Sequence, residues 1–126
     1  MIVSFVSIGI GAVLGAWSRW GLGLFLNHIF PTLPLGTLAA NLIGGFLIGI
    51  ATVLTIQHPF FSHAFRLALI TGFLGALTTF STFSAESVHL FSHREIIWGV
   101  FHILLHVVGS LLATVLGIYT ARALVT

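Results

Sequence analysis

Four apolar runs, each about the length of a membrane-spanning helix, occupy most of this sequence. They cover residues 2–26, 37–57, 65–91 and 96–122, and the segments between them are short and polar or contain proline. A bilayer core about 30 Å thick needs roughly 20 apolar residues per helix. The pattern therefore predicts an all-α membrane protein, with a single transmembrane domain over residues 1–126 and both termini on the same side.

The charged residues are too few for a soluble protein. They make up 5% of the 126 residues, whereas soluble domains carry roughly a quarter. The sequence has four scattered arginines and neither lysine, aspartate nor cysteine. These counts exclude a soluble enzyme, a disordered tail, a nucleic-acid binder and any site that uses cysteine.

The arginines do not specify an orientation in the membrane. Arg66 and Arg122 belong to one side of the four-helix arrangement, and Arg19 and Arg94 to the other. Orientation is normally set by an excess of positive charge in cytoplasmic loops. Two interpretations remain open: a balance that arises by chance in a small protein, or insertion in both orientations followed by pairing as an antiparallel dimer.

Glycines at helical spacing predict close contact between helices. Gly11 and Gly15 lie one turn apart in the first run, and Gly45 and Gly49 do so in the second. Small residues at this spacing let the backbones of membrane helices approach closely. We interpret both pairs as packing sites.

The third run contains a stretch that is poorly suited to a continuous helix. Gly72 and Gly75 are followed by five hydroxyl residues between positions 78 and 84. Glycine and hydroxyl side chains weaken a helix, and an interruption inside a membrane is tolerated where the freed groups find partners. Freed carbonyls can bind a cation and a new helix N-terminus can favour an anion. The alternative is an ordinary packing helix decorated with hydroxyls.

Two further polar features fall within the apolar runs. Asn41 lies in the second run, where its amide serves either a pore or a hydrogen bond between helices. In the fourth run, polar residues recur at every fourth position and form a stripe along one face: His102, His106, Ser110 and Thr114. The two histidines could hold a metal, but no carboxylate stands near them in the sequence.

The absence of a catalytic set leaves two classes of function. Neither Glu86 nor Glu95 has an evident partner for acid–base chemistry or for a triad, so an enzyme is not expected. A permeation protein and a passive scaffold subunit remain, and aligned polar residues favour the former. A small four-helix multidrug exporter would need a carboxylate in its first helix, where this chain has Arg19.

Several motifs, in order along nearly the whole chain, resemble the Fluc (CrcB) family of fluoride channels. They are Arg19-Trp20, Pro-x-Gly-Thr-x-x-x-Asn ending at Asn41, Thr71-Gly72-Phe-Leu-Gly75, Thr79-Phe-Ser-Thr-Phe-Ser-x-Glu86, His106-x-x-Gly109-Ser110 and Thr114. The resemblance implies an antiparallel, dual-topology homodimer with two pores in the cytoplasmic membrane of a prokaryote. It implies passive fluoride export and no nucleic-acid partner.

The resemblance also implies roles for individual residues. Backbone carbonyls of Gly75 and Thr78 would hold a structural Na⁺ at the dimer centre. The pore and fluoride path would include eight side chains: Asn41, Phe80, Ser81, Thr82, Phe83, Glu86, Ser110 and Thr114. Some relatives have tyrosine or serine where this chain has His102, so no role is carried over to it. Because an ionised Glu86 would repel an anion, we expect it at a vestibule, protonated, or hydrogen-bonded to a threonine.

Overall fold

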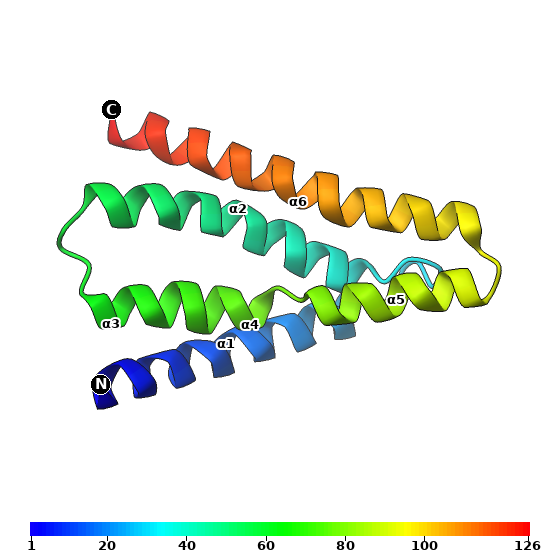
Figure 1. The fold of residues 1–126 in the computed structure, drawn as a ribbon, viewed down its shortest axis with the longest axis horizontal. Helices are drawn as coiled ribbons and strands as arrows, with labels where there is room; N and C mark the ends of the chain where they lie inside the picture. Colours follow the sequence, from blue (N-terminus) through cyan, green and yellow to red (C-terminus); the bar gives the residue numbers. More distant parts are fainter.

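The protein is built from helices joined by short loops. A computed structural model describes residues 1–126, and its elements are α1 (Ile2–Leu26), α2 (Leu35–Gln57), α3 (His63–Arg66), η1 (Leu67–Leu74), α4 (Gly75–Leu77), α5 (Phe80–Ser92) and α6 (Ile96–Val125). Four helices, of which the third comprises α3 to α5, are long and apolar enough to cross a membrane. The predicted all-α architecture with four spans is confirmed. Both termini lie at the same end of the molecule (Figure 1).

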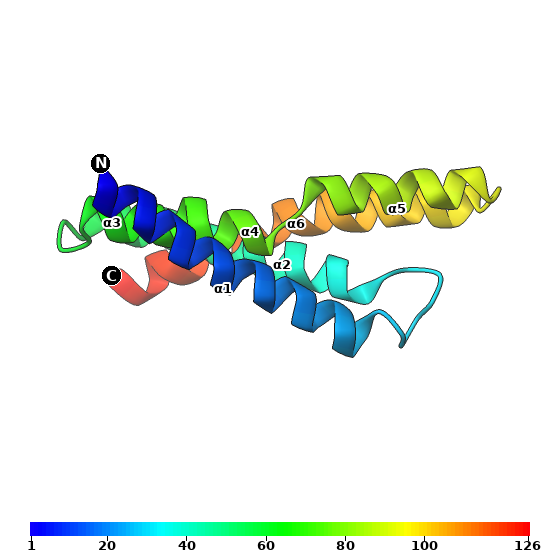
Figure 2. The same cartoon turned by 90° about the horizontal axis from the view of Figure 1, so that it is seen from below.

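The four spans pack as two close pairs. The second span, α2, lies along α6, while α1 crosses the half of the third span that contains η1 and α4 (Figure 1). At the other end of the molecule, α5 and the first half of α6 lie side by side and away from the end of α1 (Figure 2). The third span therefore changes partners halfway along its length.

The change of partner occurs where the third span is broken. The helix formed by α3, η1 and α4 ends at Leu77, and α5 begins at Phe80. Thr78 and Thr79 between them are extended, with φ, ψ of −82°, 153° and −150°, 117°. The break predicted from the glycine and hydroxyl stretch is confirmed. The π-helical turns of η1 were not expected from the sequence, although such turns recur near functional sites.

Glycines mark the lines where helix backbones meet. Gly11 and Gly15 of α1 are buried directly against backbone atoms of Ala68 and Phe73, in η1. On the other side of the molecule, Gly117 of α6 meets the backbone carbonyl of Phe46 in α2. A β-carbon would overlap backbone atoms at each of these glycines, so neither pair of helices could approach as closely with a larger residue.

Replacing Gly117 with alanine should destabilise the protein, even though alanine favours a helix by about 1 kcal/mol over glycine. The added methyl group would collide with the Phe46 carbonyl and lie 3.2 Å from the Ile50 nitrogen. Overpacking of this kind typically costs about 1–3 kcal/mol. Thermal unfolding of the purified protein in detergent measures the effect. The matched control is Gly9→Ala, whose β-carbon meets nothing within 4 Å; equal melting temperatures for the two variants would contradict this account of the packing.

Candidate functional site

The break in the third span is held by the side-chain amide of Asn41. The Thr79 N–H donates to Asn41 Oδ1 at 2.7 Å, and Asn41 Nδ2 donates to the Thr79 carbonyl at 3.1 Å. One side chain on α2 therefore satisfies both backbone groups of an extended residue. This pairing meets the requirement that irregular backbone inside a membrane keep its polar groups bonded.

The break also frees two backbone carbonyls. In a continuous helix the Thr79 N–H would donate to Gly75, and the Thr82 N–H would donate to Thr78. Here the first donates to Asn41, and the second donates to the Thr79 hydroxyl at 3.1 Å, which caps α5. The carbonyls of Gly75 and Thr78 therefore lose their helical donors. Carbonyl oxygens of this kind are ligands that a hard cation accepts.

An arginine lies beside the start of α5. The Arg19 guanidinium on α1 is 3.5 Å from the Thr82 hydroxyl, which also accepts a hydrogen bond from Thr79 at 3.0 Å. These groups border a hollow of about 460 Å³ between α1, α2 and α5, which Trp20 and Thr37 also line. The lining residues come from α1 and α5 among others, and these two helices stand apart at this end of the molecule (Figure 2).

A second hollow of about 490 Å³ lies at the break itself. Its lining includes both freed carbonyl residues, two phenylalanines and polar groups of α2 and α6: Asn41, Gly75, Thr78, Phe80, Phe83 and Ser110. The two phenyl rings meet edge to face, with centroids 5.5 Å apart and planes inclined by 60°. Phe83 is buried, whereas Phe80 is 76% exposed and stands at the outer rim of this groove.

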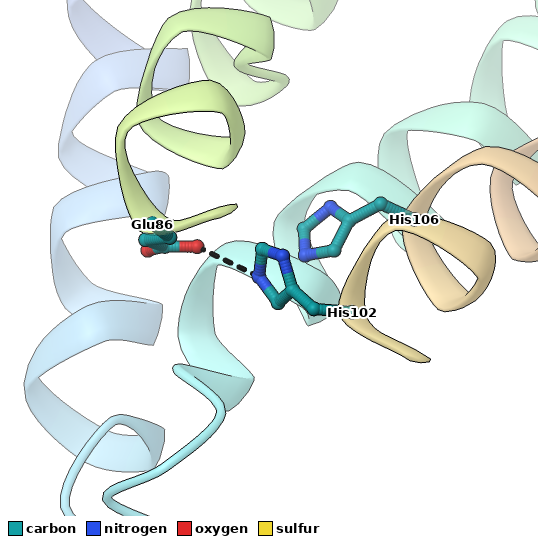
Figure 3. A group of neighbouring side chains, drawn as sticks. All are labelled: Glu86, His102 and His106. Carbon is teal, nitrogen blue, oxygen red and sulfur yellow. Dashed lines mark hydrogen bonds and ion pairs between the residues drawn. The ribbon is translucent and has the colours of Figure 1, made fainter. Parts of the chain in front are cut away.

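The carboxylate of Glu86 lies in a network of polar side chains from three spans. Thr37 donates to Glu86 Oε1 at 2.6 Å, and His102 Nε2 lies 3.2 Å from Glu86 Oε2. The other nitrogen of the imidazole, His102 Nδ1, is 3.1 Å from the Ser87 hydroxyl. Figure 3 shows the rings of His102 and His106 pointing from α6 toward Glu86 on α5.

The hydrogen-bond partners fix how many protons this network holds. The Ser87 hydroxyl donates to the Phe83 carbonyl at 2.8 Å, so it accepts a hydrogen bond from His102 Nδ1–H. The contact between His102 Nε2 and Glu86 Oε2 then holds a single proton, on either the carboxyl or the imidazole. In both arrangements the charges of the pair sum to zero. The Glu86 carboxyl group is therefore either protonated or paired with a charged His102, and it also accepts a hydrogen bond from Thr37.

Although no carboxylate is near the two histidines in the sequence, the fold brings Glu86 next to them. Ligand atoms of Glu86, His102 and His106 all lie within 4.8 Å of one another, because α5 packs against α6 (Figure 3). This set has the chemistry of a metal site. Both nitrogens of His102 already have protein partners, however, so a cation would bind here only by displacing them.

Of the remaining residues singled out in the sequence, Ser81 and Ser110 lie at the break in the third span, whereas Thr114 does not. Ser81 lies 3.3 Å from the Thr79 hydroxyl, and Ser110 lines the groove at the break. Thr114 instead faces the contact between α2 and α6 near Gly45, and its hydroxyl donates to the Ser110 carbonyl at 2.9 Å. Sequence reasoning missed Thr37 and Ser87 as partners of this network; Thr37 belonged to a quoted motif, whereas nothing marked Ser87.

Four membrane-length spans, an interrupted third span and a polar network along the interruption define a small multi-pass membrane protein of the kind that passes ions or small solutes. Comparison with known proteins gives the family. Residues 6–118 match the model described as CrcB-like protein, Camphor Resistance (CrcB), and the chain belongs to this family.

Similar proteins extend over nearly the whole chain. A Pseudomonas putida protein is 55% identical over 120 residues, covering 95% of this chain and 94% of its own length. A Pseudomonas syringae pv. maculicola protein is 49% identical over 126 residues, covering 100% and 99%. One from Nitrosospira multiformis is 53% identical over 121 residues, covering 96% and 94%. Each bears the name Fluoride-specific ion channel FluC, which is the name of a channel rather than of an enzyme.

Because Glu86 and His102 share one proton, their substitutions should be strongly coupled. His102→Leu leaves the carboxylate without its partner and should lower stability, whereas Glu86→Gln keeps an acceptor for Thr37 and a donor for His102. The double variant should be less destabilised than the sum of the two single variants, with a coupling of about 1–3 kcal/mol. Thermal unfolding of the four proteins in detergent measures the coupling, with His93→Leu as the exposed control. Additive effects would contradict a shared proton.

Proposed function

We propose that this chain forms a fluoride-selective channel, through which fluoride leaves the cell passively across the cytoplasmic membrane of a bacterium. The observation that carries the proposal is its similarity to proteins named Fluoride-specific ion channel FluC, at 49–55% identity over nearly full length. The geometry is consistent with it, since polar groups follow α5 and α6 through an otherwise apolar protein. The same similarity makes fluoride the permeating ion.

The fluoride path begins at the hollow beside α1. The Arg19 guanidinium there is a positive charge that attracts anions from solution, and it stands next to the Thr82 hydroxyl. Ser81 is exposed at the start of α5 and offers a further hydroxyl. Together these groups form a vestibule in which a hydrated anion exchanges some of its water for protein donors.

Beyond the vestibule, two phenyl rings flank the path. The edge of a phenyl ring is electrically positive and its face negative. Phe80 and Phe83 would present edges to the anion, which attract it weakly and without a hydrogen bond. Conduction requires binding that is weak enough for release, so a path that combines ring edges with few strong donors suits a strongly hydrated ion. Ser110 on α6, which lines the groove at the break, continues the polar path.

Glu86 on α5 is compatible with anion passage because the Glu86–His102 pair has no net charge. Glu86 accepts a hydrogen bond from Thr37 and shares a proton with His102. A passing fluoride ion therefore meets a neutral pair rather than a negative charge. In this chain His102 would serve to keep Glu86 neutral in the path.

The functional unit would be an antiparallel homodimer centred on the groove at the break. Gly75 and Phe80 are exposed there, and a second copy would cover them. The carbonyls of Gly75 and Thr78 fit Na⁺, because both have lost their helical donors. A hard cation takes several oxygen ligands, and a second copy would double the set. Bound Na⁺ would supply a fixed positive charge that joins the two subunits.

Fluoride efflux from liposomes tests the proposed function. Purified protein should release trapped fluoride rapidly, as followed with a fluoride electrode, while trapped chloride is retained under the same conditions. Protein-free liposomes give the background leak. Folded protein that released no fluoride, or that released chloride equally fast, would overturn the proposal.

Removing Na⁺ tests the cation site and the dimer together. In detergent, replacement of Na⁺ by N-methylglucamine should lower the melting temperature of the dimer and increase the monomer fraction, because a ligand bound only by the assembled state stabilises it. Light scattering measures the mass and a thermal scan the stability, with K⁺ as a second replacement. A dimer of unchanged stability without Na⁺ would contradict a structural cation.

A further inference from the structure

Two histidines lie in contact at the end of α5, outside the polar network of Glu86. The rings of His89 and His93 have their centroids 4.1 Å apart, with planes inclined by 38°. Both side chains are exposed. They lie at the turn between α5 and α6, at the end of the molecule opposite the two termini (Figure 1). Because this turn ends a membrane-length span, the two rings are accessible to ions in water.

The spacing along the chain brings the two rings to one face of the helix. Residues four apart lie one turn apart on the same side of a helix. His89 belongs to the last turn of α5, and His93 is the residue that ends it. A Zn²⁺ ion binds imidazole nitrogens at about 2.0–2.1 Å, so two nitrogens bound to one ion lie within about 4 Å of each other. Rings at the observed separation can therefore place one nitrogen each on the same ion.

A hydrogen bond sets which nitrogen of His93 is available to a ligand. His93 Nδ1 lies 2.9 Å from the His89 carbonyl oxygen. A carbonyl oxygen can only accept, so Nδ1 carries the hydrogen of the neutral ring and Nε2 keeps an unshared electron pair. Metal-binding histidines generally donate their other ring N–H to a carbonyl or carboxylate, which fixes the ring and its tautomer. His93 already has this supporting contact.

The surroundings of the two rings do not oppose a cation. The last carbonyls of a helix carry partial negative charge, which favours a cation at the final turn. Arg94 and Glu95 follow directly, and their formal charges cancel. At His102, by contrast, a cation would have to displace protein partners from both ring nitrogens. Binding through His93 Nε2 leaves the hydrogen bond of Nδ1 in place.

We propose that His89 and His93 form a surface site for a divalent transition-metal ion such as Zn²⁺, Ni²⁺ or Cu²⁺, bound through Nε2 of His93 and one ring nitrogen of His89. Imidazole suits these ions, whereas Mg²⁺ and Ca²⁺ take oxygen ligands. Water completes the coordination of the ion. The bound ion joins the last turn of α5 to the turn that leads into α6, and it therefore stabilises this end of the α5–α6 pair. The site goes beyond the proposed function and does not depend on fluoride conduction.

Metal titration of the purified protein, without an affinity tag, tests the site. In detergent, Cu²⁺ should bind more tightly than Zn²⁺, and each should raise the melting temperature, whereas Mg²⁺ should do neither. His89→Gln and His93→Gln should each weaken the tightest Cu²⁺ site at least about 100-fold, because the second ligand of a chelating pair acts at high effective concentration. The matched control is His63→Gln, which removes an exposed histidine at the opposite end of the molecule (Figure 1) and should leave binding unchanged.

The ligand atoms can be identified in the wild-type protein. In ¹⁵N-labelled protein, the ring signals of His89 and His93 are assigned as those that the corresponding variant lacks. Addition of Zn²⁺ should shift the Nε2 signal of His93 and one nitrogen signal of His89, while Nδ1 of His93 stays protonated. The signals of the other histidines should not move.

Each outcome decides for or against the site. Wild-type protein that binds neither Cu²⁺ nor Zn²⁺ at millimolar concentration, or unchanged affinity in His89→Gln or His93→Gln, would overturn it. Affinity lost only in His102→Leu would place the ion beside Glu86 and would overturn it equally. Weaker binding in both α5 variants, unchanged binding in His63→Gln and Zn²⁺-dependent shifts of both rings would support it. Neither measurement uses flux, so the result stands apart from that of the liposome experiment.

Discussion

The two hydrogen bonds between Asn41 and the backbone of Thr79 are the constraint on which the rest of the structure depends. A membrane supplies no water to satisfy a broken helix, so each unpaired backbone group there costs several kcal/mol. At 2.7 and 3.1 Å, one amide satisfies both groups of the extended residue. The third span can therefore be interrupted in the middle of the protein without leaving the backbone groups of Thr79 unpaired.

Three features of the site follow from that pairing. The carbonyls of Gly75 and Thr78 lose their donors and become available to a ligand. The extended residues redirect the chain, so that α5 leaves α1 and packs along α6 (Figure 2). That change of partner brings Glu86 beside His102 and leaves room next to Arg19. The hollow beside Arg19, the Glu86–His102 pair and the freed carbonyls therefore share one cause.

Much of this architecture could be predicted from the sequence, because hydrophobic length and backbone-breaking residues are local signals. The four spans and the broken third span are readable from the apolar runs and from the glycines and hydroxyls that follow residue 72. The partners of the polar side chains are not local. Glu86 and His102 meet only because α5 packs on α6. The sequence marks Asn41 as a polar residue inside a span, but it does not show that its amide bonds the backbone of Thr79. The π-helical turns of η1 have no evident local signal.

Several hydroxyls of α5 and α6 already donate to their own helices, which limits how strongly they would bind an anion. The hydroxyls of Ser84, Ser87 and Thr114 donate to carbonyls one turn earlier in their own helices. Such a hydroxyl can rotate toward an ion, but it must give up an existing bond to do so, and the net gain is small. In the proposed path, donors that are already engaged in this way would bind an ion weakly enough to release it.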